Sequence, residues 1–164
     1  MKVLFSAILI LLPFTLFAQR GNNASTDISI SASVIRSLEL ITVNSITFGN
    51  TQPGQIEVSV DPVNDPNAGF MVALGTPEAD FRLDYLEERR LINTSREGFI
   101  TFVYRISTNT IEDQSSSVLM NYEDRNLRFN EDGTYYIWVG GLVNLENATP
   151  GDYEGDFTIE IDYI

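Results

Sequence analysis

Apolar and polar residues alternate one for one through several short segments of this chain, and no long segment repeats its apolar residues with a helical period. The clearest case is residues 157–163, where four apolar or aromatic side chains alternate with Thr158, Glu160 and Asp162. Because successive side chains of a β-strand point to opposite faces, this pattern predicts a strand with one buried face. The alternation therefore favours an all-β fold.

The same reading predicts further strands, separated by clusters of Gly, Pro, Asn and Asp. They lie at residues 28–34, 45–48, 56–60, 69–74, 81–85, 99–106, 135–139, 142–145 and 157–163. Seven to nine short strands with turns between them predict an immunoglobulin-like antiparallel β-sandwich. The mature chain is long enough for one domain, which we expect at residues 28–164.

Five breaks and connections are also predicted from local pattern. The alternation shifts near Ile41 and Val43, which indicates a bulge or a break around Arg36-Ser37. The charged residues 86–91 predict a connector between strands, and the polar residues 107–117 predict a loop. Asp132-Gly133 lies between two strand-like runs and predicts a hairpin, whereas Gly140-Gly141 predicts an interruption.

The first eighteen residues have the layout of a secretory signal peptide. Met1-Lys2 supplies a positive start, the apolar run 3–17 follows, and Ala18 precedes a polar stretch. The apolar run is too short and its downstream flank too polar to favour a membrane span. We therefore expect a signal peptide at 1–18, a polar N-terminal arm at 19–27, and an exported protein that is periplasmic, cell-surface or extracellular in a bacterium, with no membrane insertion after cleavage.

The composition excludes several classes of chemistry. The chain has no Cys and no His, so disulfides, lipid attachment at a cysteine, and Ser–His or Cys–His nucleophiles are impossible. Zinc, copper and iron sites are disfavoured for the same reason. Ten basic residues face 23 acidic ones, for a net charge of −13 at pH 7, which disfavours nucleic acid and anionic membrane surfaces. We expect no enzyme, no cofactor and no catalytic residue.

Carboxylates are the remaining chemical candidates. Acidic pairs that could act in glycoside hydrolysis occur at Glu87-Glu88, Glu123-Asp124 and Glu131-Asp132. All three pairs lie in turns or charged connectors, where a solvated surface position is the ordinary explanation. Oxygen ligands for calcium crowd two loops, which contain Asp61, Asn64, Asp65 and Asn67 in the first and Asn130, Glu131 and Asp132 in the second. Asp and Asn are also ordinary turn residues, and neither loop has EF-hand spacing, so we assign no metal ligand.

Aromatic residues and N-glycosylation patterns are further candidates for binding or modification sites. Tyr136 and Trp138 share one face of a predicted strand, and Tyr135 and Ile137 share the other, so one pair is expected in the core and the other is open to a sugar-stacking role. Acceptor patterns for N-glycosylation occur at Asn23, Asn93 and Asn147. In a chain with a bacterial type of signal peptide we interpret them as coincidental.

Two motifs carry a resemblance. Residues 46–49 (I-T-F-G) near the start, together with 140–142 (G-G-L) and 151–159 (G-D-Y-E-G-D-F-T-I) near the end, resemble a family of exported bacterial proteins catalogued as domain of unknown function 4402. The likeness covers roughly residues 28–163. This chain differs from the usual pattern in its acidity and in the charged segment 86–91.

A looser resemblance concerns pilus subunits of the chaperone–usher route, which tend to end with a penultimate tyrosine and a glycine fourteen residues from the end. Tyr163 and Gly151 occupy these positions. In such subunits a neighbour's N-terminal segment completes the sandwich by β-strand addition. Residues 28–34 have the alternation that this requires. A half-buried first strand of the domain itself explains the same alternation without a neighbour.

These observations predict a secreted or surface-displayed structural or adhesive β-sandwich module, which can be a fimbrial-type subunit assembling by β-strand addition. We expect its partner to be a second copy or another surface protein, paired through open sheet edges. The alternative is a carbohydrate- or calcium-binding surface module.

Overall fold

The computed structural model describes residues 36–48, 51–52 and 54–164, which belong to one compact unit of the chain, Val34–Ile164. The predicted signal peptide, the polar arm and the predicted strand at 28–34 lie outside the described residues. The described part contains eleven strands in two sheets, a three-residue 3-10 helix and no α-helix. All strand pairs are antiparallel. The predicted all-β antiparallel sandwich is confirmed.

The elements in chain order are β1 (Glu39–Asn44), β2 (Glu57–Val60), β3 (Gly69–Leu74), β4 (Asp80–Tyr85), β5 (Glu88–Asn93), β6 (Phe99–Asn109), η1 (Gln114–Ser116), β7 (Val118–Leu119), β8 (Asn126–Arg128), β9 (Thr134–Asn144), β10 (Tyr153–Glu154) and β11 (Ile159–Tyr163).

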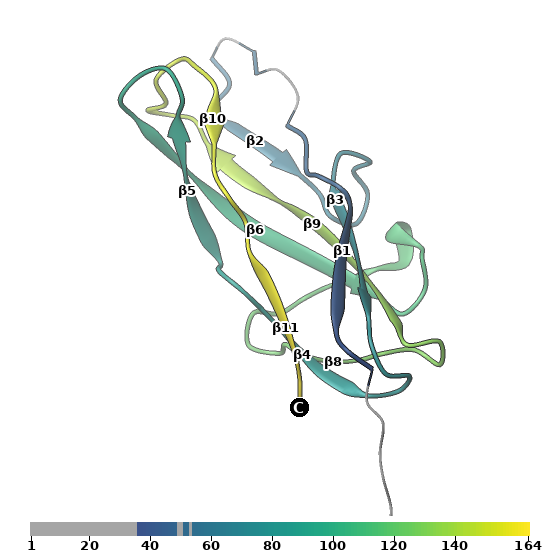
Figure 1. The fold of residues 1–164 in the computed structure, drawn as a ribbon. Helices are drawn as coiled ribbons and strands as arrows, with labels where there is room; N and C mark the ends of the chain where they lie inside the picture. Colours follow the sequence, from purple (N-terminus) through teal and green to yellow (C-terminus); the bar gives the residue numbers. More distant parts are fainter. Residues whose placement is uncertain (1–35, 49–50, 53) are drawn as a thin grey trace, which may run out of the picture. The chain divides into compact units, whose positions relative to one another are not determined.

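The large sheet has eight strands, with the order β1-β3-β9-β6-β5-β10; β2 also pairs with β9, and β7 also pairs with β6. Figure 1 shows β6 and β9, the two eleven-residue strands, running side by side through its middle. The small sheet has three strands in the order β11-β4-β8. The chain passes from one sheet to the other five times, on entering and leaving β4, on entering and leaving β8, and between β10 and β11.

The core lies between the inner faces of the two sheets. In β4, Phe81 and Leu83 are fully buried while Arg82 between them is exposed, as the alternation of that segment predicts. The opposing face of the large sheet contributes Ala73, Phe102, Ile137 and other buried apolar residues to the same cluster. Closely packed apolar layers thus take the place of the disulfides that the chain lacks.

The segment predicted as a charged connector is a strand. β5 pairs with β6 from Glu88↔Val103 to Ile92↔Phe99. The prediction was wrong because, of the five paired residues, only Leu91 packs against the core, so the segment shows no alternation.

The total of eleven strands is above the seven to nine expected, and β1, β5, β7, β8 and β10 lie outside the segments predicted as strands. Residues 45–48, predicted as a strand, are not one, and the predicted segments 135–139 and 142–145 form the single strand β9.

The predicted hairpin at Asp132-Gly133 is a turn, but it joins different sheets. The Gly133 N–H donates to the carbonyl of Asn130 at 3.0 Å, as in a tight turn. However, β8 pairs with β4 in the small sheet, and β9 pairs with β3, β2 and β6 in the large one. A local turn signal therefore predicted the reversal of the chain correctly and the pairing of the strands wrongly.

Three further boundaries differ from the sequence prediction. Residues 107–109, expected in a loop, form the end of β6. The bulge expected around Arg36-Ser37 lies in β1, where the register shifts between Thr42 and Asn44. Gly140-Gly141 does not interrupt β9, because the strand continues through both residues and changes its neighbour there from β3 to β2.

The glycines at this changeover allow close packing. A Cβ atom on Gly141 would overlap the carbonyl oxygen of Val103, and the residue has a φ of +153°, which other residues rarely adopt. A Cβ on Gly140 would overlap the carbonyl oxygen of Val60. The glycine pair therefore marks the close approach of three strands.

Candidate functional site

The first loop considered for calcium is held by its own hydrogen bonds. Asp61 accepts from the Val63 N–H at 3.0 Å and from the Asn64 side chain at 2.8 Å. Asp65 accepts from the N–H and the side chain of Asn67, at 2.9 Å and 2.8 Å. The bonds from Asn64 and Val63, helped by Arg105, outweigh the opposing effect of burial and lower the pKa of Asp61. These carboxylates shape turns.

The second loop is organised in the same way around Asn130. Its side-chain oxygen accepts from the N–H groups of Asp132 and Thr134, at 3.1 Å and 2.8 Å, and its side-chain nitrogen donates to Thr110. Glu131 and Asp132 are exposed. Within residues 36–48, 51–52 and 54–164, no group of three or more acidic side chains is arranged to hold a metal ion.

The other acidic pairs lie at the surface. Glu87 and Glu88 stand at the start of β5, and Glu123 and Asp124 lie in the loop before β8; all four are exposed. A general acid in glycoside hydrolysis needs a carboxyl group buried in a cleft. The surroundings of these pairs are those of solvated side chains.

The aromatic residues of β9 lie on two faces of the strand, as predicted, and Trp138 on the outer face is also buried. Tyr135 and Ile137 are buried in the core between the sheets. On the outer face, Trp138 is only 5% exposed, and its ring stacks on Phe70 with centroids 5.2 Å apart and planes at 15°. Because Trp138 is buried and uses one ring face for this contact, it does not offer a flat, open platform for a sugar.

A loop anchored by buried hydrogen bonds lies against this outer face. Ser107, which is opposite Trp138 in the β6–β9 pair, donates from its hydroxyl to the carbonyl of Pro62 at 3.0 Å. Gln114 in η1 donates to the carbonyls of Pro62 and Asp65, at 3.0 Å and 2.9 Å. The loop 61–67 is thereby fixed to the sheet.

Of the glycosylation patterns, Asn23 lies outside the described residues and Asn147 is exposed. Asn93 is only 5% exposed, and its side-chain oxygen accepts from the N–H groups of Ser95 and Arg96. Its amide nitrogen donates to the Thr149 carbonyl at 3.4 Å. Asn93 is therefore a turn-forming residue.

An incompletely covered part of the sandwich lies along β1 and β11, each of which ends its sheet. We call this the open side and define it by five inward-facing residues, Leu38, Leu40, Ile159, Ile161 and Tyr163. All five pack against the core but keep part of their surface exposed. Their cross-strand partners Phe81, Leu83 and Ala73 are fully buried.

This contrast has a simple cause. β4 has a neighbour on both sides, whereas within the described part of the chain β11 pairs only with β4 and β1 pairs only with β3. One long edge of each strand thus presents backbone N–H and C=O groups without a ladder partner among those residues. The open side combines unpaired backbone with incompletely covered apolar side chains.

Tyr163 is the last residue of β11, which ends beside the C-terminus marked in Figure 1. Its hydroxyl donates to the carbonyl of Arg36 at 2.8 Å and accepts from the N–H of Thr76 at 2.7 Å. The Arg36 N–H in turn donates to the Thr76 hydroxyl at 2.8 Å. The penultimate tyrosine therefore brings the start of β1 to the end of β11.

A groove of about 650 Å³ lies at the opposite end of the large sheet's inner face. Its lining includes apolar side chains of Val58, Leu91, Ile100 and Val143, from four strands of that sheet. No residue of the small sheet lines it, because β4, β8 and β11 cover only the other part of the inner face.

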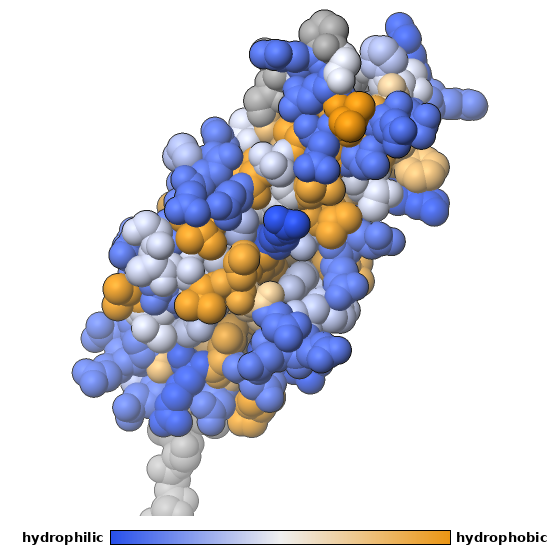
Figure 2. Space-filling model, turned by 180° about the vertical axis from the view of Figure 1, so that it is seen from behind, coloured by the Kyte–Doolittle hydropathy of each residue, from blue (hydrophilic) through white to orange (hydrophobic). Residues whose placement is uncertain are grey.

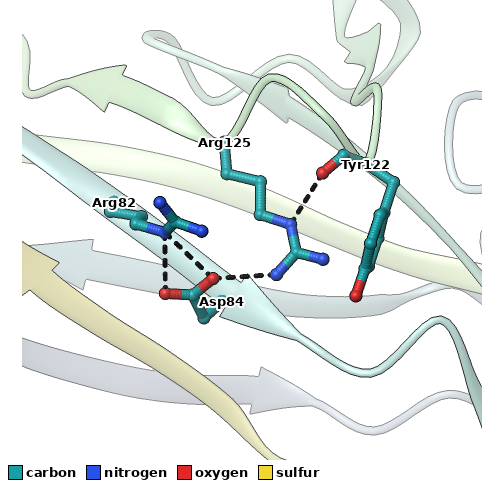
Figure 3. Close-up of polar contacts among 4 residues, drawn as sticks. All are labelled: Arg82, Asp84, Tyr122 and Arg125. Atoms are coloured by element: carbon teal, nitrogen blue, oxygen red, sulfur yellow. Dashed lines mark hydrogen bonds and ion pairs between the residues drawn. The ribbon is translucent and has the colours of Figure 1, made fainter.

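An ion-pair cluster that the sequence did not reveal fixes the loop before β8 (Figure 3). Arg125 bonds through Nη1 to Asp84 at 2.8 Å and donates through Nε to the Tyr122 carbonyl at 2.8 Å. Its guanidinium also lies 3.5 Å from the centroid of the Tyr122 ring. Burial pushes the pKa of Asp84 upward, but hydrogen bonds from Arg82 and Arg125 outweigh it and the pKa is lowered. The cluster positions Tyr122.

Apolar residues are also exposed on the outer face of the large sheet. Ile41, Ile92, Phe99 and Val103 are between 40% and 65% exposed. Figure 2, which shows the molecule from behind the view of Figure 1, has a band of apolar residues between hydrophilic ones. Contiguous exposed apolar surface is typical of proteins that contact a partner.

No protein-family model matches the chain, and no curated protein sequence is similar to it. The two resemblances noted in the sequence remain predictions. Within the described residues, no helix has both the length and the apolar character needed to span a membrane.

Proposed function

We propose that this chain is an exported structural or adhesive module of the bacterial surface that assembles by β-strand addition at the open side. The observation that carries the proposal is the partial exposure of Leu40, Ile159 and Ile161, all of which face the core. Full burial of an aliphatic side chain is worth about 1.5–3 kcal/mol, so a strand that covers several of them binds favourably.

The inserted strand has to supply apolar side chains on one face and backbone hydrogen bonds along its edge. Residues 28–34 (I-S-I-S-A-S-V) fit this requirement, since Ile28, Ile30, Ala32 and Val34 alternate with serines. The segment carries no charge, so the inserted strand itself adds no like-charge repulsion where it contacts the acidic second copy. We therefore assign residues 28–34 of one copy to the open side of the next.

Cysteine pairing tests this assignment directly, because the chain has no cysteine of its own. Two single variants, Ile30→Cys and Ile161→Cys, are mixed under oxidising conditions. Directly opposed residues on adjacent strands have Cβ atoms about 4.5–5.5 Å apart, close to the spacing that a disulfide requires. We expect a disulfide-linked heterodimer; Ile28→Cys and Ala32→Cys sample neighbouring registers.

The matched control is Glu160→Cys, which lies on the same strand but faces outward and should not cross-link. The proposal is wrong if no register forms the heterodimer. It is also wrong if the double variant Ile30→Cys/Ile161→Cys forms only an internal disulfide, because residues 28–34 would then be the domain's own strand. Deletion of 28–34 should likewise abolish assembly while leaving the fold intact.

A further inference from the structure

A slot of about 470 Å³ opens on the edge of β6, in the gap between β5 and β7. Both strands pair with the same side of β6: β5 with residues 99–103, and β7 with residues 107–108. The residues of β6 between these two ranges line the slot. The slot is therefore a short gap between two neighbours of one long strand.

The backbone of β6 presents an acceptor and a donor at this gap. The Tyr104 N–H donates to the Glu87 carbonyl, and the Ile106 carbonyl accepts from the Met120 N–H, both at 2.8 Å. Because the N–H and C=O of one residue in an antiparallel strand point to the same side, the Tyr104 C=O and the Ile106 N–H also point into the slot. Neither group has a backbone partner among the described residues.

These two groups require a ligand whose donor and acceptor lie side by side on one edge. A trans amide, as in a peptide bond or an N-acetyl group, cannot bond both, because its N–H and C=O point in opposite directions. A carboxylate has acceptors only, and ammonium and guanidinium groups have donors only. A primary carboxamide has its oxygen and one N–H on the same edge, so it can bond the Tyr104 carbonyl and the Ile106 N–H together. Among protein side chains, this group belongs to asparagine and glutamine.

The slot admits a compact group rather than a strand. Glu87 and Met120 already bond to β6 on either side of the two free groups, so an extended chain cannot pair along this edge. A side chain that enters end-on needs only the gap itself. The slot's volume lies within the range of about 300–1,000 Å³ of small-ligand sites, which leaves room for a carboxamide and the methylene groups that carry it.

The rim of the slot is apolar and exposed, which suits a protein partner. Val103, Leu119 and Tyr122 line the slot and are 40%, 54% and 40% exposed. Figure 3 shows the Tyr122 ring beside Arg125, whose guanidinium lies 3.5 Å from the ring centroid. Contacts that surround a polar pocket and exclude water from it are typical of the centre of protein interfaces. A nucleotide is disfavoured, because its phosphate would meet a protein with a net charge of −13.

We propose that this slot binds the side-chain carboxamide of a glutamine or asparagine on a partner protein, whose flanking apolar residues cover Val103 and Leu119. The carboxamide N–H donates to the Tyr104 carbonyl, and the carboxamide oxygen accepts from the Ile106 N–H. The inference gives the adhesive module a second contact. It does not depend on strand addition, because the slot lies on β6 and the open side lies on β1 and β11.

Amide chemical-shift mapping of the folded protein with propionamide, which is the glutamine side chain without its backbone, tests the two hydrogen bonds. So small a ligand binds in the millimolar range or more weakly, and concentrations up to about 100 mM are therefore used. We expect the Ile106 amide to shift progressively with propionamide concentration. N-methylacetamide, an isomer of propionamide with a trans amide, and propionate should cause much smaller shifts, because each can bond only one of the two groups.

A short peptide tests the assignment to a protein partner. The sequence Ala-Leu-Gln-Leu-Ala, blocked by an acetyl group and an N-methyl amide, carries a single primary carboxamide. We expect it to bind at least about tenfold more tightly than propionamide, since its leucines cover the apolar rim. The same peptide with glutamate in place of glutamine should lose this binding.

A matched pair of variants on β7 locates the binding. Leu119 lines the slot and its neighbour Val118 does not, although both are exposed. Leu119→Trp should fill the slot and weaken binding of the peptide at least about tenfold, while Val118→Trp should bind as the unaltered protein does. Equal weakening by both variants would place the binding outside the slot and refute the inference.

The inference is overturned if propionamide does not shift the Ile106 amide, because the slot then takes up water only, or if N-methylacetamide shifts it equally. Adenine presents a similar donor and acceptor on one edge. If adenine binds more tightly than the glutamine peptide, or if the peptide binds no more tightly than propionamide, the assignment to a protein partner is wrong. Since all these measurements use the monomer, failure here leaves the cysteine-pairing result unaffected.

Discussion

Replacing Phe81 with alanine tests whether the two sheets share one core. Phe81 is fully buried in β4, the central strand of the small sheet. Its ring stacks on Phe129 with centroids 4.2 Å apart and meets Tyr135 of the large sheet edge-on at 5.3 Å. Phe81→Ala removes both contacts and leaves a cavity between the sheets.

The expected loss can be worked out from these contacts. Truncation of a fully buried phenylalanine costs about 3–5 kcal/mol, and the two aromatic contacts place Phe81 in the middle of that range or above it. We therefore expect a loss of about 4 kcal/mol in the free energy of unfolding. For a domain of this size that lowers the melting temperature by roughly 12–16 °C.

Urea denaturation followed by tryptophan fluorescence measures the loss, because Trp138 lies on the large sheet. The matched control is Phe99→Ala, the same chemical change at a residue that is 55% exposed and contacts the Arg90 guanidinium at 4.6 Å. The control should cost at most about 1 kcal/mol. If both variants lose the same stability, or if Phe81→Ala costs less than about 1 kcal/mol, the two sheets do not form one cooperative core.

Three further changes have expected outcomes. Gly141→Ala places a Cβ against the Val103 carbonyl at a φ of +153° and should cost at least about 2 kcal/mol by chemical denaturation. Burial raises the pKa of Tyr104 from 10.0 to about 12. A side chain whose pKa is higher in the folded state than in the unfolded state stabilises the fold at pH values below the unfolded-state pKa, and this stabilisation is lost as the pH rises towards the folded-state pKa. Between pH 10 and 12 the melting temperature of Tyr104→Phe should therefore fall less than that of the unaltered protein. The lowered pKa of Asp84 has the opposite effect on stability. The ionised carboxylate stabilises the fold above pH 3.8, and this stabilisation is lost as the pH falls through the lower pKa of the folded state. Asp84→Asn should therefore show a weaker acid dependence of its melting temperature, and an unchanged dependence would rule out the ion pair with Arg125.

The sequence predicted those strands whose side chains alternate between the core and the exterior. In β4 and β11 every second residue faces the core, so the alternation of Phe81, Leu83, Ile159 and Ile161 with polar residues is a direct record of burial. The sequence missed β5, since near the border of the sheet only Leu91 packs inward and Arg89 and Arg90 remain exposed. Alternation is lost where the covering layer ends.

Candidate sites were predicted less well than strands. The clusters of Asp and Asn in the loops suggested calcium, but the same side chains cap turns, and only the hydrogen bonds of Asp61 and Asn130 distinguish the two roles. The pairing of Arg125 with Asp84, 41 positions apart, has no local signature at all.

The order of the residues alone determined that the chain forms strands, where several of the longer ones lie, and that no disulfide holds them together. The tertiary structure decided which strands pair: it placed β8 and β9 in different sheets across one tight turn and gave β9 two neighbours at Gly140-Gly141. Among the described residues, it also left β11 with a single neighbouring strand at the open side. The physical reason is that side-chain alternation reports only on the two faces of a strand, whereas pairing takes place along its edges, through backbone groups that every residue possesses.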